Sequence, residues 1–259
     1  MAATFIRMDQ TKRSIVLGAL ACVLGLGAAL AADKAPDGKM PVTTRKSPRV
    51  QGAPYVRAQQ ITGENKLYDP ANGQAPKGHE NEGALCETKM WSEFSFEWGP
   101  PDLRREGQQW VARMQLKVAT INVGMGTVLW LPANAPDWIV DHEETHRAIS
   151  ERVYIEGIPK LSALLKGMNG KTYEGRGATS AEAVNAIRKL AQGQIDTTYS
   201  ELLPKRQGRL NDEFDRRTRH GVNQKKSAGQ FMAEIFADEA AATQAQGTTQ
   251  TGGKGDARK

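Results

Sequence analysis

The sequence has little cysteine, histidine or aromatic content, and these shortages narrow the classes of protein it can be. Its 259 residues include two cysteines, too few for a disulfide-stapled scaffold or a cysteine-rich zinc ribbon. Charge of one sign is not concentrated either: the net charge is +6 with Lys and Arg spread along the chain, so we expect no nucleic-acid partner. Aromatic residues make up 6%, which predicts a core over only part of the chain. The four histidines are His79, His142, His146 and His220.

The N-terminus is typical of a secretory signal peptide. Basic residues within 7–13 precede an apolar run that ends in Ala-Leu-Ala before Ala32. A transmembrane anchor is one alternative and a lipoprotein attached through Cys22 is another, but the cleavage motif and the glycines favour a signal peptide. We therefore expect a secreted or periplasmic protein that loses residues 1–31. It would keep no stable membrane anchor, and Cys86 would be its one remaining thiol.

The composition divides the remaining chain into three segments. Residues 32–83 hold six of the twelve prolines and few large apolar side chains, as is typical of a Pro-rich linker or extended arm. Residues 238–259 are rich in Ala, Gln, Thr and Gly, and we expect them to be a disordered tail. One folded domain is therefore predicted over residues 84–237.

Within this domain the hydrophobic pattern changes once, from the period of strands to that of helices. Alternating apolar residues predict strands over 93–98, 110–118, 121–123 and 127–131. After Pro132 the pattern is helical to the end of the domain. Strands followed by helices predict an α+β fold with a small antiparallel sheet.

Capping residues and apolar stripes predict the helix bounds. The first helix is expected from Asn134, as N-cap, to about Glu156, with Gly157 as its end. A second helix is expected over 180–203, capped by Ser180 or Thr179. A third is expected through Leu210 and Phe214 to Gly221, and a last short helix over 231–236.

The first predicted helix contains His-Glu-Glu-Thr-His, an H-E-x-x-H motif. His142 and His146 are four residues apart, so one helical face can present both to one metal ion. Glu143 lies about 100° around the helix from His142, where it can act as general base on a metal-bound water. The histidine pair favours zinc. The expected fold therefore places a zincin-like active-site helix after the sheet, followed by further helices.

A solvated, charged helix face is the alternative interpretation of this motif, because Asp141, Glu144 and Arg147 surround the histidines. Ile149 and Val153 continue the stripe of His142 and His146, however, and apolar residues precede the motif. We therefore expect the histidines to face a core.

A catalytic zinc needs a third protein ligand and one open position. Ile149 and Arg152 stand where the metzincin extension requires glycine and histidine, which excludes that class. His220, just before Gly221, is the predicted third ligand, and Asp215 could orient a ligand. The alternative for His220 is a helix-terminal residue that interacts with the helix dipole. The weaker ligand candidates are Glu151, Glu156 and Glu174.

Two segments together resemble a bacterial domain-of-unknown-function family described as predicted secreted zinc-dependent proteases. They are residues 132–153, with the histidine motif, and residues 214–224, which read Phe-Asp-x-x-Thr-x-His-Gly-x-x-Gln. The resemblance covers about residues 84–225, and the Asp, Thr, His and Gly of the second segment are its more discriminating part. The family often has tyrosine where Phe214 stands. The resemblance implies a zinc site and, less specifically, proteolysis.

The sequence therefore predicts a secreted or periplasmic zinc metallohydrolase, and more specifically a metallopeptidase acting on peptide or protein substrates. His142, His146 and His220 would bind zinc, and Glu143 would deprotonate a bound water that attacks the carbonyl. The strand at 127–131 is expected to pair with an extended peptide substrate. Two alternatives stay open: an inactive, metal-stabilised envelope protein, and a non-enzymatic binder of anionic envelope polymers through the basic N-terminal arm.

Overall fold

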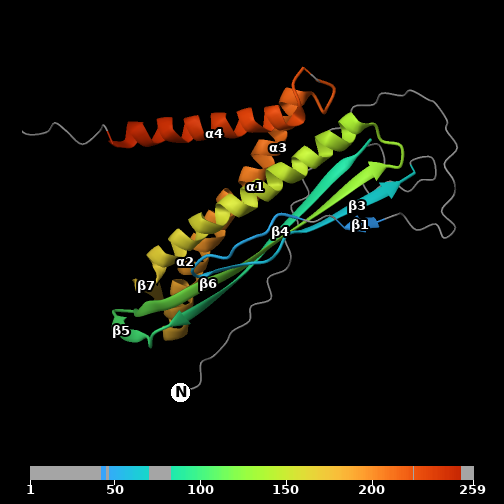
Figure 1. The fold of residues 1–259 in the computed structure, drawn as a ribbon. Coiled ribbons are helices and arrows are strands. Elements are labelled where there is room, and N and C mark those ends of the chain that lie inside the picture. The colour runs from blue at the N-terminus through green and yellow to red at the C-terminus, as the bar shows by residue number, and fades with distance from the viewer. Residues whose placement is uncertain (1–41, 45–46, 70–82, 224, 252–259) are drawn as a thin grey trace, which may run out of the picture.

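The computed structural model describes residues 42–44, 47–69, 83–223 and 225–251. They form a mixed α/β fold in which helices pack against a seven-stranded sheet (Figure 1). The predicted signal peptide lies outside the described residues. None of the helices in the described part of the chain is long and apolar enough to cross a membrane.

One long central strand, β6, organises the sheet. It pairs with every strand except β1, which pairs with β3 at the margin. The strands in chain order are β1 (Val42–Thr44), β2 (Val56–Ala58), β3 (Thr62–Tyr68), β4 (Leu85–Trp98), β5 (Asp102–Glu106), β6 (Gln109–Pro132) and β7 (Thr172–Gly177).

The prediction of an antiparallel sheet is correct only in part. β4, β5 and β7 run antiparallel to β6, but β2 and β3 run parallel to it, so the sheet is mixed. The strands predicted around Gly124 and Gly126 are one continuous strand of 24 residues. Position 124 in this strand requires glycine, because the Trp91 side chain of β4 lies over it and a Cβ would overlap the indole ring. The length of β6 leaves room for β2 and β3 opposite β4.

The prediction of an arm over residues 32–83 is wrong for the described part of that segment. Val56, Ile61 and Tyr68 are at most 3% exposed and belong to the hydrophobic interior. The strands that carry or flank them have only three to seven residues. Strands this short, separated by prolines, lack a recognisable alternating pattern, and their partner β6 lies far along the chain.

The longest helix, α1 (Asp137–Met168), lies along the sheet and extends beyond its predicted C-terminal end. It begins after Pro136 instead of Asn134, and it continues through Gly157 and Pro159. Gly157 is a point of close packing: a Cβ there would overlap the side chain of Leu203, which joins the next two helices. The glycine therefore permits helix packing and does not end the helix.

The second predicted helix is confirmed as α2 (Ser180–Leu202). Thr179 caps it, accepting a hydrogen bond from the Glu182 N–H while the Glu182 carboxylate accepts one from the Thr179 N–H. The next helix, α3 (Pro204–Thr218), lies beside α1 and ends three residues before the predicted position.

The C-terminal segment is more ordered than predicted. The helix α4 (Ala228–Thr251) replaces the short helix over 231–236 and includes residues 238–251 of the predicted disordered tail. Its alanine-rich sequence favours a helix. Glu239 binds Arg206 of α3 with a shortest N–O distance of 2.7 Å, which anchors α4 to the domain.

Candidate metal centre

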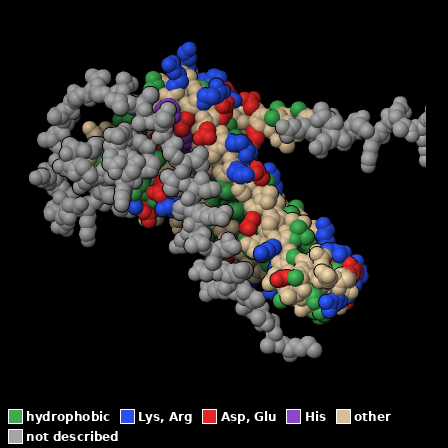
Figure 2. Space-filling view, turned by 180° about the vertical axis from the view of Figure 1, so that it is seen from behind, with side chains coloured by type: hydrophobic (Ala, Val, Ile, Leu, Met, Phe, Trp, Pro, Cys, Tyr) green, Lys and Arg blue, Asp and Glu red, His purple; other side chains and the backbone are tan. Residues whose placement is uncertain are grey.

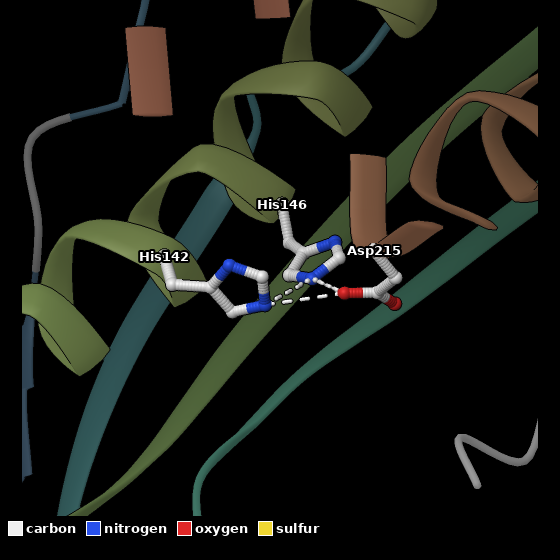
Figure 3. A group of neighbouring side chains, drawn as sticks. All are labelled: His142, His146 and Asp215. Carbon is white, nitrogen blue, oxygen red and sulfur yellow. Dashed lines mark hydrogen bonds and ion pairs between the residues drawn. The ribbon is translucent and has the colours of Figure 1, made fainter. Parts of the chain in front are cut away.

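Two histidines of α1 and one aspartate of α3 meet where these helices face each other (Figure 3). The Nε2 atoms of His142 and His146 are 3.1 Å apart. The Oδ1 atom of Asp215 lies 3.1 Å from the first and 3.0 Å from the second. A tetrahedral zinc ion with bonds of 2.0–2.1 Å separates its ligand atoms by about 3.3 Å. The three atoms therefore have the spacing required to bind one small metal ion together.

The alternative of a solvated helix face is wrong. His142 is 7% exposed, and Ile149 and Val153 on the same stripe are fully buried. Phe214 of α3 stacks on the His142 ring with 4.9 Å between centroids and meets the His146 ring edge-on at 5.0 Å. The phenyl ring thus holds both imidazoles with their Nε2 atoms toward Asp215.

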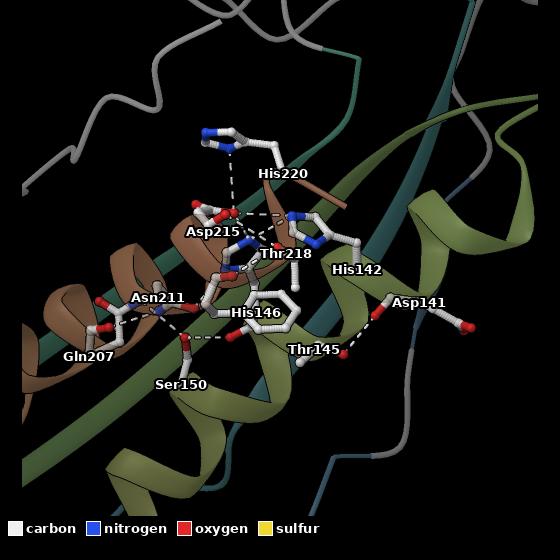
Figure 4. A network of polar contacts seen from close by, with 11 residues as sticks. Asp141, His142, Thr145, His146, Ser150, Gln207, Asn211, Asp215, Thr218 and His220 are labelled. Carbon is white, nitrogen blue, oxygen red and sulfur yellow. Dashed lines mark hydrogen bonds and ion pairs between the residues drawn. The ribbon is translucent and has the colours of Figure 1, made fainter. Parts of the chain in front are cut away.

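Asn211 determines which nitrogen of His146 carries the proton (Figure 4). The Nδ2 group of Asn211 donates to the Gln207 carbonyl at 3.0 Å, so its Oδ1 is the acceptor for His146 Nδ1 at 2.7 Å. The Nδ1–H of His146 therefore donates to Asn211. This leaves the lone pair of Nε2 directed at the group shared with His142 and Asp215, as in histidines that bind metals.

The electrostatics of the group indicate a need for a cation. A lone pair on His146 Nε2 and a carboxylate oxygen 3.0 Å away are both acceptors, so they repel unless a proton or a metal ion lies between them. Burial alone would lower the pKa of His146, but the hydrogen bond to Asp215 and the nearby charge of Glu143 raise it to about 9. For Asp215, burial alone would raise the pKa, but the hydrogen bonds with His142 and His146 hold the pKa of this carboxyl far below its usual range.

Glu143, the predicted general base, is buried at 8% exposure. Its charge contributes to the raised pKa of His146. Burial, followed by that same charge, raises the pKa of the Cys86 thiol on β4. The carboxylate is therefore close to the ligand group, without being one of the three residues that form it.

His220, the predicted third ligand, lies next to this group. Its Nδ1 is 3.5 Å from Asp215 Oδ1, and its side chain is 48% exposed. Positive φ angles at Arg219, His220 and Gly221 turn the chain sharply after α3. Histidine side chains are visible at the surface beside acidic and basic ones at this end of the molecule (Figure 2). Metal binding by His220 stays a prediction, and Asp215 is the residue that the structure brings to the pair.

The weaker candidates from the sequence are engaged elsewhere or lie outside the group. Glu174 on β7 pairs with Arg113 and Arg176. Glu156 pairs with Arg206, and Glu151 is buried on α1 outside the three-residue group.

The sequence patterns did not reveal the roles of Asn211 and Phe214. Together with Asp215 they are spaced at i, i+3 and i+4, so they share one face of α3. A search for polar residues at that spacing opposite the H-E-x-x-H motif could have found Asn211 and Asp215.

The predicted substrate strand at residues 127–131 is not available for pairing. This part of β6 is hydrogen-bonded to β4 on one side and to β3 on the other. A peptide cannot add to a strand whose two edges are already paired.

No family model, curated protein or solved structure matches this chain. The resemblance to predicted secreted zinc-dependent proteases therefore remains a prediction that depends on the two motifs. The case for a metal centre depends on the geometry of its side chains.

Proposed function

We propose that this protein is a zinc-dependent hydrolase, more specifically a metallopeptidase, that acts outside the cytoplasm after removal of residues 1–31. The observation that carries this proposal is the convergence of His142, His146 and Asp215 on one point. The H-E-x-x-H spacing supports it, because this motif combines two metal ligands with a general base.

In this proposal His142, His146 and Asp215 hold the ion, and Asn211 keeps His146 in the binding tautomer. Bound zinc would lower the pKa of a water molecule and polarise the substrate carbonyl. The Glu143 carboxylate would take a proton from this water as the water attacks the carbonyl, and it would return that proton to the leaving amine. Its buried position near the ligands suits this transfer.

Substitution of Glu143 by glutamine tests the proposal. The amide keeps the shape of the side chain but cannot accept the proton, so peptide hydrolysis should fall about 10²–10⁴-fold while zinc remains bound. Asp212→Asn, on the exposed surface of α3, is the matched control and should leave both properties unchanged. Equal turnover in Glu143→Gln would contradict the general-base role. A zinc-loaded protein that cleaves no peptide would favour the metal-stabilised, inactive alternative.

A further inference from the structure

The strand β4 has one edge with which no other strand of the described chain pairs. It is paired with β6 along its length, and the remaining described strands pair with β6 or with β3. In an antiparallel strand, alternate residues direct their N–H and C=O groups away from the partner, so residues 85–98 present a row of donors and acceptors at this edge. Proteins often protect long edges with proline or with bulges, but β4 contains no proline, and its one register shift lies at its end, between Glu97 and Trp98. The strand therefore offers a long, regular edge to a further strand.

The same strand leaves apolar side chains half-exposed. None of the β4 side chains is buried, whereas many side chains of the neighbouring β6 are. Phe94, Phe96 and Trp98 point to one face and form a ladder of rings, with centroids 5.8 Å and 5.9 Å apart. These rings pack against the hydrophobic core but stay half-buried. Such exposure is expected where a sheet stops, and side chains of a further strand would cover the rings.

The sequence of β4 is complementary to itself when two copies run antiparallel. In a continuous sheet, directly opposite residues face the same side, so only alternate registers are allowed. One allowed register is centred on Trp91 and uses residues 85–97 of both copies. Lys89 then lies opposite Glu93 of the second copy, and the two-fold axis repeats this pair. Opposite charges therefore meet twice in this register, and no like charges lie directly opposite each other.

The neighbouring registers lack this match. A centre one residue earlier places Glu87 opposite Glu93 of the second copy, and a centre one residue later places Glu87 opposite Glu97. Like charges directly opposite each other destabilise a strand pair. A centre at Thr88 also matches opposite charges, but it pairs only residues 85–91. The charge pattern thus favours the register that uses nearly the whole strand.

The side chains at the edge can make these contacts. Glu93 is exposed, and no ion pair of its carboxylate is found among the described residues. Lys89 Nζ lies 2.8 Å from Glu87 Oε1, with the two side chains 65% and 36% exposed. An exposed pair of this kind is weak, and an ammonium group has three donors, so Lys89 can contact both carboxylates.

The core-facing side of the strand fits in the same register. Phe94 would lie opposite Thr88 of the second copy, and Phe96 would lie opposite Cys86. Each copy would therefore cover rings that the other leaves half-exposed.

We propose that two copies of this chain pair through the free edges of β4 and form one continuous sheet across a two-fold axis at Trp91. Backbone hydrogen bonds join the two edges, and the Lys89–Glu93 pairs fix the register. The contact is the same on both copies, as in most symmetric dimers. An extended peptide can use the same backbone groups, but the charge match is specific to a second copy. This inference goes beyond the proposed hydrolase function and does not depend on it.

Sedimentation velocity of the full chain at increasing concentration measures the dissociation constant of the dimer. We expect a concentration-dependent dimer. Lys89→Glu and Glu93→Lys each replace two attractive pairs by two repulsive ones, so each should weaken the dimer about tenfold or more. Glu97→Lys is the matched control, because it makes the same change of charge on the same strand opposite Leu85, and it should leave the dimer intact.

Two restored combinations separate lost pairing from lost folding. The double variant Lys89→Glu, Glu93→Lys exchanges the charges and should recover the dimer. The two single variants should also pair with each other when mixed, because one carries two carboxylates at these positions and the other carries two ammonium groups. A chain that stays monomeric at every concentration, or a dimer that the single variants leave unchanged, would overturn the proposal. A monomer whose β4 amide signals in NMR shift only when an extended peptide is added would assign the edge to a peptide and also overturn it.

Discussion

Two polar clusters join the same helices of this protein, and they differ in where the positive charge comes from. At one end of the α1–α3 contact, Arg206 binds Glu156 and Glu239, with shortest N–O distances of 2.7 Å for both. At the other end, His142, His146 and Asp215 converge with similar separations. The first cluster contains its own permanent cation. The second has only imidazoles and a carboxylate, so it requires a proton or a metal ion.

This difference separates a structural cluster from a candidate binding site. The guanidinium of Arg206 cannot lose its charge, and its bonds link α1, α3 and α4 into one unit. His146 can exchange its proton for a metal, because Asn211 already fixes the other ring nitrogen. The comparison predicts that changes in the histidine cluster affect metal affinity, whereas changes in the arginine cluster affect stability alone.

The largest effect is expected from Asp215→Ala, which removes one of the three proposed ligands. Zinc affinity should fall by at least about a hundredfold, because two histidines alone leave the ion without the third protein ligand of a catalytic site. Equilibrium titration against a competing chelator measures this change. Asp212→Ala on the same helix is the control, and an unchanged affinity in Asp215→Ala would rule out this carboxylate as a ligand.

Arg206→Met should leave zinc affinity unchanged and lower the free energy of unfolding by about 2 kcal/mol. The carboxylates of Glu156 and Glu239 would lose the cation between them, although both are partly exposed, which limits the cost. Urea unfolding measures the loss. A second change, Glu239→Gln, should recover part of it, and a strong effect of Arg206→Met on zinc binding would erase the distinction between the clusters.

Asn211→Leu should weaken zinc binding about 10–100-fold, the effect typical of removing a residue that orients a histidine ligand. Asn211→Asp keeps an oxygen acceptor for the Nδ1–H of His146 and should restore most of the affinity. If the leucine and aspartate variants bind zinc equally, the tautomer argument for His146 is incorrect.

The smallest expected effect is the release of a proton from His146 when zinc binds. In the zinc-free chain the pKa of His146 is raised to about 9, so the protonated form stabilises the fold at pH values below the ordinary histidine pKa. That contribution is lost as the pH rises through about 9, and zinc binding near pH 7 should release about one proton from this ring. Calorimetric titration in two buffers with different ionisation enthalpies measures the release. An identical heat in both buffers would contradict it.

Local signals in the sequence predicted the parts of the fold that depend on neighbouring residues. The capping residue Thr179 set the start of α2, and the alternating residues 93–98 belong to β4. The predicted end of α1 was wrong because Gly157 packs closely against Leu203, a contact between helices that local sequence does not reveal. The parallel strands β2 and β3 were not predicted for the same reason, since their partner β6 lies some 60 residues further along the chain.

The candidate site was predictable to a similar extent. The spacing of His142 and His146 is a local property of one helix, and it predicted that both face one point. The third member depends on which face of α3 meets α1. Sequence reasoning chose His220 because it closes a helix just before Gly221, where the chain can turn back toward the first helix. Packing around Phe214 instead brings Asp215 toward the pair.

The central claim is that His142, His146 and Asp215 bind one zinc ion. X-ray absorption at the zinc edge of the zinc-loaded protein tests it most directly. The account predicts two imidazole nitrogens and oxygen donors at about 2.0–2.1 Å, with no sulfur at about 2.3 Å. A chain that binds no zinc, or whose zinc spectrum lacks imidazole scattering, would contradict the claim.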